Sequence, residues 1–410
     1  MSKLEELIEQ YCPDGVEWKK YYDVCDLIRG ITYNKNQEAK TEKEDAYKVL
    51  RANNITLYLN TLNFDDVKLV SKDVVVKPEQ HLYAGDILMC AGSGSKEHVG
   101  KVAYIFQNMD YTFGGFMAVV RCKEDVIPRY MFHILTSHYF TSHLETQINS
   151  STINNINRQV MQSFVFPVPP LPVQEEIVRI LDNFTELQAE LQAELQKRKQ
   201  QYNYYLDNLL SFNRGGQTEV KWMKLKDIGK VCMCKRILKS QTSSSGDVPF
   251  FKIGTFGGNA DAYISQALFN EYKAKYSYPQ KGNVLISAAG TIGRTIVFDG
   301  TPSYFQDSNI VWLKHDESIV LNSYLRYCYA LNPWVVSTGG TIARLYNDNI
   351  LEATIPVPSL ANQQRIVSIL DRFDTLTTDL TQGLPAEIEK RRQQYEYYRD
   401  KLLTFKRKGA

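Results

Sequence analysis

Residue types that can carry out catalysis occur in this chain, but their spacing does not match the catalytic motifs we considered. A phosphate-binding loop requires G-x-x-x-x-G-K-[ST], and residues 91–97 (AGSGSKE) lack that spacing. An amine methyltransferase would carry Asn or Asp, two prolines and an aromatic residue, whereas residues 332–334 read Asn-Pro-Trp. Asp14 and Glu17 stand too close together for the strand hairpin that presents the paired carboxylates of a nuclease. We therefore expect no catalytic site and no cofactor.

Loops that mix Arg, Lys and Asn offer the chemistry of DNA recognition instead. Lys and Arg neutralise phosphates, while Arg pairs with guanine edges and Asn with adenine edges. The formal net charge is only +2, so a DNA surface would have to come from local clustering. The candidate DNA-contacting residues are Arg29, Tyr33, Asn34, Lys35, Arg51, Asn53, Asn54, Lys96, Lys101, Lys235, Arg236, Lys239, Lys252, Arg294 and Arg344.

Lys101 and Arg294 end matching glycine-containing loops, which predicts a phosphate clamp in each half of the chain. The polar stretch 150–155 and its counterpart 339–344 could serve the same purpose. Any one of these loops could equally be an ordinary solvated surface. The basic clusters 197–199, 390–392 and 406–408 more often decorate a solvated helix face.

The cysteines indicate a reducing compartment. There are 7, an odd number, and only Cys232 and Cys234 are close together, without a second Cys or His pair at zinc-finger spacing. The first residues are acidic and helical in pattern, and no apolar run is long enough to cross a membrane. We expect a cytoplasmic protein without a metal site.

The chain repeats itself. Residues 167–182 run from Pro-Val-Pro-Pro-Leu to Ile-Leu-Asp, and residues 356–371 run from Pro-Val-Pro-Ser-Leu to the same Ile-Leu-Asp. Residues 198–205 recur as 391–398, so the second copy has gained an insertion between its two matched stretches. Agreement of this length indicates an internal duplication.

Both matched stretches have the pattern of long helices. Their large apolar side chains follow an alternating three- and four-residue spacing, the period of a coiled coil, and in the second copy Leu380 continues it. Gly383 and Pro385 predict that the second helix breaks and restarts, with the proline in a first turn. The two helices are expected to bury their stripes against each other; the alternative is that each packs on its own domain. The residues predicted to pair the helices are Ile177, Leu181, Phe184, Tyr202, Tyr205, Leu209, Ile366, Leu370, Phe373, Tyr395, Tyr398 and Leu402.

The segments between the helices have the pattern of mixed α+β domains. Short apolar runs such as 74–76, 87–89 and 284–286 predict strands, and they alternate with helical patterns at 130–141 and 321–330. A few short matching motifs relate the two segments, but the rest of their sequences differ. This is expected if two different recognition domains, which we call readers, are attached to one duplicated pair of long helices. The predicted domains are 1–165 with a short helix at 3–11, the helix 166–214, the second reader 215–354 and the second helix region 355–410.

The doubled signature P-x-P-x-L-x-x-Q-x-x-I-x-x-I-L-D, with the order reader–helix–reader–helix, resembles the specificity subunits of type I restriction–modification systems over essentially the whole chain. The resemblance implies two target-recognition domains that each read one half of a bipartite, asymmetric site on double-stranded DNA. It also implies an antiparallel coiled coil that sets the half-site separation and docks two methylation (modification) subunits, to which restriction (motor and nuclease) subunits are added. The insertion around Gly383 departs from the usual pattern and leaves the half-site spacing open.

Two other functions stay possible at this stage. A single-chain DNA nuclease or methyltransferase with duplicated binding domains is disfavoured by the missing motifs. A coiled-coil scaffold without a DNA role is disfavoured by the paired basic loops and the divergence of the readers. The leading interpretation is a non-catalytic DNA specificity subunit without membrane contact.

Overall fold

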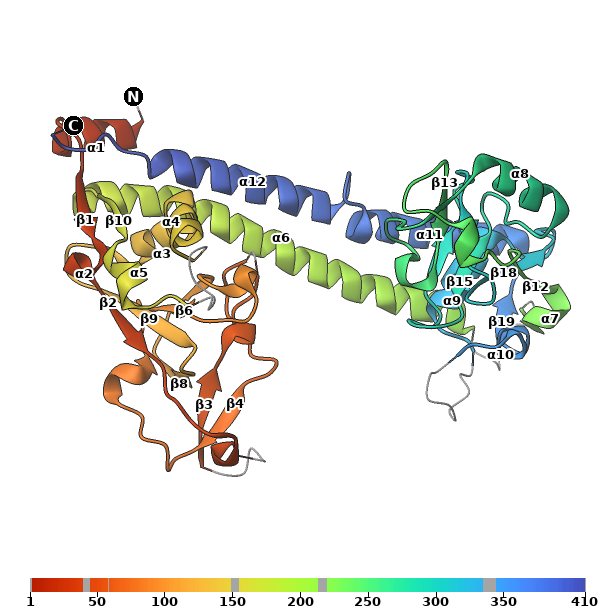
Figure 1. The fold of residues 1–410 in the computed structure, drawn as a ribbon, viewed down its shortest axis with the longest axis horizontal. Helices are drawn as coiled ribbons and strands as arrows, with labels where there is room; N and C mark the ends of the chain where they lie inside the picture. The colour runs from red at the N-terminus through yellow and green to blue at the C-terminus, as the bar shows by residue number, and fades with distance from the viewer. Residues whose placement is uncertain are drawn as a thin grey trace. The chain divides into compact units, whose positions relative to one another are not determined.

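The chain forms two compact units, one consisting of Met1–Gln192 with Glu387–Ala410 and the other of Ala193–Ala386. The computed structural model describes residues 2–39, 45–57, 59–148, 155–212, 220–334 and 344–409. Each unit contains one globular reader together with parts of both long helix regions (Figure 1). We call the globular part of the first unit reader one and that of the second unit reader two.

Reader one is built from three sheets and short helices. Its sheets have the strand orders β2-β9-β6-β7, β4-β3-β8-β5 and β1-β10. Its strands are β1 (Glu17–Lys20), β2 (Cys25–Arg29), β3 (Ala46–Leu50), β4 (Lys68–Ser71), β5 (His81–Leu82), β6 (Ile87–Cys90), β7 (Val102–Tyr104), β8 (Met109–Phe113), β9 (Met117–Cys122) and β10 (Val165–Val168). Its α-helices are α1 (Lys3–Tyr11), α2 (Tyr21–Val24), α3 (Pro128–Thr136), α4 (His138–Ile148) and α5 (Arg158–Gln162).

Reader two repeats this plan. Its sheets have the orders β12-β18-β15-β16, β14-β13-β17 and β11-β19. Its strands are β11 (Lys221–Lys224), β12 (Gly229–Met233), β13 (Val248–Phe251), β14 (Tyr263–Ile264), β15 (Val284–Ser287), β16 (Thr295–Val297), β17 (Tyr304–Phe305), β18 (Ile310–His315) and β19 (Thr354–Val357). Its α-helices are α7 (Leu225–Ile228), α8 (Gln266–Lys275), α9 (Asn322–Ala330) and α10 (Asn347–Leu351). The long helices are α6 (Leu171–Ser211), α11 (Leu360–Thr378) and α12 (Leu384–Leu402).

The central strand of each reader is buried on both faces. In β6, Ile87 and Met89 join the core beneath the helices, while Leu88 and Cys90 join a second core on the opposite face. Successive side chains of a strand point to opposite faces, so a strand between two cores reads as a continuous apolar run. β15 in reader two has the same burial along its whole length. This explains why both central strands could be located from the sequence.

The repeated glutamine fastens each reader to the helix that follows it. Gln174 is fully buried; its Nε2 donates to the carbonyls of Asp125 and Pro169 at 2.9 and 2.7 Å, and its Oε1 accepts from the Ile127 amide at 2.9 Å. Gln363 makes the corresponding three bonds: its Nε2 donates to the carbonyls of Ile319 and Pro358, and its Oε1 accepts from the Leu321 amide, each at 2.9 Å. A buried amide with all three bonds formed holds the start of the helix against the reader.

The N-terminal part of α6 pairs with α12 in the first unit, and its C-terminal part pairs with α11 in the second. In the first unit Phe184 stacks on Tyr398 with ring centroids 5.4 Å apart. In the second unit Tyr205 stacks on Phe373 at 5.2 Å, an equivalent pair with the two copies exchanged. Early residues of α6 thus meet late residues of the second helix region, and the pairing is antiparallel.

The structure places every predicted helix-pairing residue in an apolar cluster or an aromatic stack. Ile177, Leu181 and Tyr395 are buried in the core of the first unit, with Phe184 and Leu402 packed against it. The core of the second unit buries Ile366 and Leu370, with Tyr202 and Leu209 packed against it. The remaining members of the set, Tyr205, Phe373 and Tyr398, lie in the two stacks.

The second helix region is interrupted where Gly383 and Pro385 predict a break. α11 ends at Thr378, and Asp379 accepts from the Thr381 amide and hydroxyl. A Cβ at Gly383 would lie 2.5 Å from the Thr375 carbonyl oxygen, so the turn requires glycine. α12 then begins at Leu384, with Pro385 in its first turn, where a missing N–H costs little.

Two sequence predictions were wrong. Residues 74–76 form no strand, and Val75 has 81% of its surface exposed. Leu380 lies in the turn between α11 and α12 rather than on the helix seam, and it is 79% exposed. In both cases an apolar residue suggested burial that the local backbone does not provide.

Candidate nucleic-acid interface

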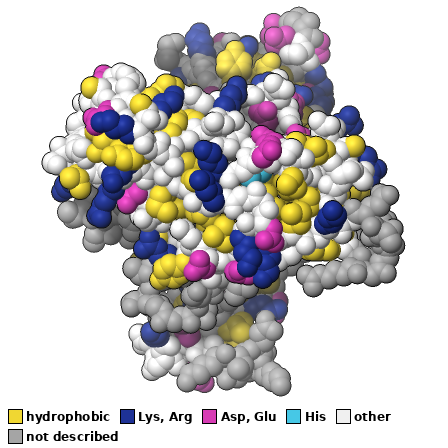
Figure 2. All heavy atoms as spheres, turned by 90° about the vertical axis from the view of Figure 1, so that its right-hand side faces the viewer, with side chains coloured by type: hydrophobic (Ala, Val, Ile, Leu, Met, Phe, Trp, Pro, Cys, Tyr) yellow, Lys and Arg dark blue, Asp and Glu magenta, His cyan; other side chains and the backbone are white. Residues whose placement is uncertain are grey.

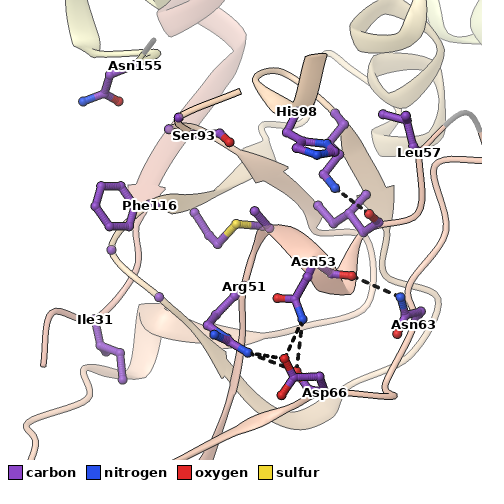
Figure 3. A pocket seen from close by; sticks show the side chains of 18 of the residues that line it. Ile31, Arg51, Asn53, Leu57, Asn63, Asp66, Ser93, His98, Phe116 and Asn155 are labelled. Atoms are coloured by element: carbon purple, nitrogen blue, oxygen red, sulfur yellow. Dashed lines mark hydrogen bonds and ion pairs between the residues drawn. The ribbon is translucent and has the colours of Figure 1, made fainter. Parts of the chain in front are cut away.

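A cleft of about 1420 Å³ opens in reader one, between loops that follow the ends of its strands (Figure 3). Its walls come from residues 31–33 after β2, from the 3₁₀ turn η2 (Ala52–Asn54) after β3, from the β6–β7 loop, and from residues 114–117, which run from the turn after β8 to the first residue of β9. Four of the predicted DNA-contacting residues, Tyr33, Arg51, Asn53 and Lys101, line it.

Asn54 supports the turn at one wall of the cleft and is buried away from any ligand. It is fully buried, its Oδ1 accepts from the Arg51 amide at 2.8 Å, and its Nδ2 donates to the carbonyls of Asn63 and Asp66 at 3.1 and 3.2 Å. The residue type predicts a DNA contact at this position. The structure instead places Asn54 as a cap of the turn that carries Arg51 and Asn53.

Arg51 and Asn53 converge on one carboxylate. An Arg51 Nη donates to Asp66 Oδ2 at 2.7 Å, and Asn53 Nδ2 donates to the same oxygen at 3.1 Å (Figure 3). Arg51 Nε is buried without a hydrogen-bond partner among the described residues. The ion pair is partly solvated and therefore weak, so both side chains could leave Asp66 for a phosphate or a base edge.

The same arrangement recurs in reader two. Lys252 precedes the 3₁₀ turn η6 (Ile253–Thr255) as Arg51 precedes η2, and its Nζ lies 2.8 Å from a carboxylate oxygen of Asp261. Thr255 Oγ1 accepts from the Lys252 amide at 3.1 Å, as Asn54 does for Arg51. Each reader therefore presents a partly exposed cation, paired with an aspartate, at the start of one turn.

Lys101 and Arg294 also occupy one structural place. Lys101 Nζ donates to the Ile55 carbonyl at 2.7 Å, just beyond η2, and Arg294 donates to the Gly257 carbonyl at 3.3 Å, just beyond η6. Burial lowers the pKa of Lys101, whereas Arg294 is exposed. Lys101 thus contacts the end of the turn that follows Arg51, and Arg294 contacts the end of the turn that follows Lys252. Arg294 is the more accessible of these two cations.

The remaining predicted residues are spread over both readers. Arg29 ends β2 rather than lying in a loop; its guanidinium donates to Asn155 Oδ1 at 3.1 Å and to the Ile156 carbonyl, and burial lowers its pKa. Arg344 similarly donates to the Ser308 carbonyl at 3.2 Å. Lys235 lies over the ring of Tyr276 at 5.2 Å. The side chains exposed on the surface are Asn34, Lys35, Lys96, Arg236 and Lys239.

Parts of the two polar stretches lie outside the described residues, namely 150–154 and 339–343. On the face of reader two shown in Figure 2, the described Lys and Arg side chains are interspersed with apolar and acidic ones. Within the described ranges, no group of three or more His, Cys, Asp and Glu side chains could hold a metal ion. In the same ranges, no helix is both long and apolar enough to cross a membrane.

His98, Phe116 and Asp66 line the cleft, and reasoning from the sequence missed all three. His98 Nδ1 is buried and has no hydrogen-bond partner among the described residues. Phe116 follows two glycines, a pair that predicts a turn and so could have marked it as a surface residue; in the structure it is 76% exposed. No sequence signal identifies Asp66 as the partner of Arg51.

The chain is similar to known proteins over both of its halves. The model of the type I restriction modification DNA specificity domain matches twice, at residues 13–198 and 217–390. A putative type I restriction enzyme specificity subunit of Haemophilus influenzae is 43% identical over 417 residues, covering 98% of each chain. A type I restriction enzyme specificity subunit of Escherichia coli is 37% identical over 255 residues, covering 58% of this chain and 61% of that protein.

A solved structure has the same fold. One chain from work on the complex assembly and conformational transition of the type I restriction–modification system matches with a TM-score of 0.57 and 18% identity. The match covers 95% of this chain and 97% of that one. At this identity the likeness concerns the fold.

Proposed function

Because this chain belongs to the family of type I restriction–modification specificity subunits, we propose that its two readers bind the two halves of one bipartite, asymmetric site on double-stranded DNA. The chain is a non-catalytic DNA specificity subunit with two target-recognition domains. Its partners are DNA and the other subunits of a type I complex. The proposal concerns which residues meet the DNA and how the partners are arranged.

The observation that carries the proposal is the recurrence of the same cationic arrangement in both readers. Arg51 and Lys252 each stand at the start of a 3₁₀ turn and each pair with an aspartate. A cation paired with a solvated carboxylate is already held near the position in which it would bind a phosphate. Exchanging the carboxylate for a phosphate costs little free energy. We place both residues on phosphates, with Asn53 and the surrounding loops at base edges.

The helix pair gives the second part of the proposal. The proposed domains are 1–165, 166–214, 215–354 and 355–410, with the helices of the second and fourth setting the distance between half-sites. Two modification subunits dock on these helices and restriction subunits join that complex. DNA of the cell is the substrate of such a complex and all seven cysteines are free, so we place its work in the cytoplasm.

The test is a gel shift with this chain purified alone and in complex with its modification subunit, combined with sequencing of methylated DNA from cells that express both. We expect weak binding by the chain alone and tight, site-specific binding by the complex. Methylation should fall in a two-part motif with an unspecified gap. A continuous motif, or methylation that does not depend on this chain, would contradict the proposal.

A further inference from the structure

Phe116 is an exposed aromatic side chain on the wall of the reader-one cleft. Its ring is 76% exposed and lies opposite the wall that carries Arg51 and Asn53 (Figure 3). Single exposed apolar side chains are common on protein surfaces, so the exposure of Phe116 alone assigns it no role. Its position in the lining of the cleft, beside polar groups, is what points to a ligand contact.

The backbone holds Phe116 firmly. Its carbonyl accepts from the amides of Ala91 and Gly92, both at 2.9 Å, and the Met117 amide closes the turn on the Gly114 carbonyl at 2.7 Å. A Cβ at Gly92 would lie 3.2 Å from the Phe116 ring, so the bare glycine makes room for it. The backbone at Phe116 is therefore held in place beside the cleft, so contact with a ligand would cost little backbone entropy.

An amide stands beside the ring. Asn155 lines the cleft, and Arg29 holds its Oδ1 at 3.1 Å, which orients the side chain. The wall formed by Phe116 and Asn155, which we call the aromatic wall, thus combines an apolar face with a hydrogen-bonding group. Apolar groups contact the C5-methyl of thymine in the major groove, and amides pair with adenine.

Reader two has a polar counterpart to this wall. The Ala288 amide donates to the Asn309 carbonyl at 2.7 Å as the Ala91 amide does to Phe116, which identifies Asn309 as the equivalent residue. The Leu345 amide donates to the Ala288 carbonyl at 2.9 Å, as Ile156 does to Ala91, which makes Arg344 the equivalent of Asn155. Arg344 lies 3.4 Å from Asn309 Oδ1. The same structural position is therefore apolar in reader one, where it is Phe116, and polar in reader two, where it is Asn309.

We propose that Phe116 is a base-reading residue of the first half-site and that it contacts the C5-methyl group of a thymine. The inference rests on the proposed function and adds a specificity-determining position to it. An apolar contact discriminates thymine from cytosine and uracil without releasing a counterion from the DNA backbone.

The experiment uses the complex of this chain with its modification subunit, and DNA carrying its methylation site, measured by equilibrium binding at several salt concentrations. For Phe116→Ala we expect about tenfold weaker binding, an unchanged salt slope and relaxed preference at one base of the first half-site. Uracil in place of that thymine should weaken binding of the wild type by a similar factor and leave the variant unaffected. Phe116→Asn, which introduces the residue of reader two, should also lose the thymine preference.

Phe106→Ala is the matched control, because Phe106 is also 76% exposed and does not line the cleft. Its affinity and base preference should equal those of the wild type. The inference is overturned if Phe116→Ala keeps both affinity and preference, if it lowers the salt slope, or if the wild type tolerates uracil at every thymine of the first half-site. Failure of the wild-type complex to bind any site specifically would instead overturn the proposed function.

Discussion

The two readers share the side chains that hold their own fold together and differ at the aromatic wall of the reader-one cleft. Tyr130 and Tyr324 each donate to a proline carbonyl, of Pro167 and Pro356, at 3.0 Å. β1 pairs with β10, and β11 with β19, in the same register around a tryptophan and a proline. The aromatic wall, by contrast, is replaced by polar side chains. The duplicated readers therefore share contacts that hold the fold, and they differ at the position that we propose to contact a base.

The junction between reader and helix pair shows an intermediate case. In the first unit the buried His133 bridges Asp182 of α6 and Tyr395 of α12, at 2.9 Å to each. In the second unit Tyr327 donates to Asp371, which occupies the place of Asp182 in the repeated signature. The aspartate is kept, while its partner changes from histidine to tyrosine. The comparison therefore predicts different pH behaviour for the two units.

The largest effect is expected at the shared glutamines. Gln174→Ala and Gln363→Ala should each lower the free energy of unfolding by about 3 kcal/mol, because a buried amide N–H and two carbonyls lose their partner. Urea unfolding followed by circular dichroism measures this. Gln393→Ala, at an exposed position on α12, is the control and should change little. A loss of less than about 1 kcal/mol at either glutamine would show that its hydrogen bonds are not what holds the helix against the reader.

The next effect depends on pH. Burial lowers the pKa of His133 to about 4, against hydrogen bonding to Asp182, which raises it. The unfolded histidine binds a proton near pH 6.5 and the folded one does not, so stability is lost as the pH falls from 6.5 towards 4. Between pH 7 and pH 5 the loss should be about 2 kcal/mol.

His133→Tyr, which copies Tyr327 of reader two, should remove this dependence over the same range. The measurement is the unfolding free energy of both proteins at the two pH values. An equal loss in the variant would assign the acid sensitivity to other groups and remove the predicted difference between the units.

A smaller effect is expected at the paired cations. Arg51→Ala and Lys252→Ala should each weaken binding of the complex to all sequences and lower its salt slope by about one unit, because each removes one phosphate contact. Binding titrations over a range of salt concentrations report this. Lys275→Ala is the control, since Lys275 is also paired with an acid but lies on α8 outside the turn. A change confined to one base position would identify a base reader instead.

The smallest effect separates two residues that the sequence makes equivalent. Arg294 is exposed, so Arg294→Ala should lower the salt slope by about one unit. Lys101 is half-buried on the Ile55 carbonyl, so Lys101→Met should leave the slope unchanged and weaken binding only through the loosened turn. Equal salt slopes for the two variants would contradict this difference and support the phosphate clamp that the sequence predicts in each reader.

The sequence predicted the duplication, the central strands and the long helices better than the residues that line the cleft. Repeated residues reveal the duplication. The periodicity of apolar residues reveals the buried central strands and the pairing of the long helices, because it depends on local backbone geometry. The role of Asn54 could not be predicted, because its type suits both a cap and a base contact and only the fold decides between them. Asp66 and Phe116 enter the cleft through turns whose geometry leaves no periodic pattern.

Exchange of reader two would test whether each reader specifies one half of the DNA site. Residues 215–354 would be replaced by the corresponding segment of another specificity subunit, and the methylated motif read by sequencing DNA from cells that express the hybrid with its modification subunit. The account predicts that one half of the motif changes while the other half stays as it was. A change in both halves, or in neither, would contradict it.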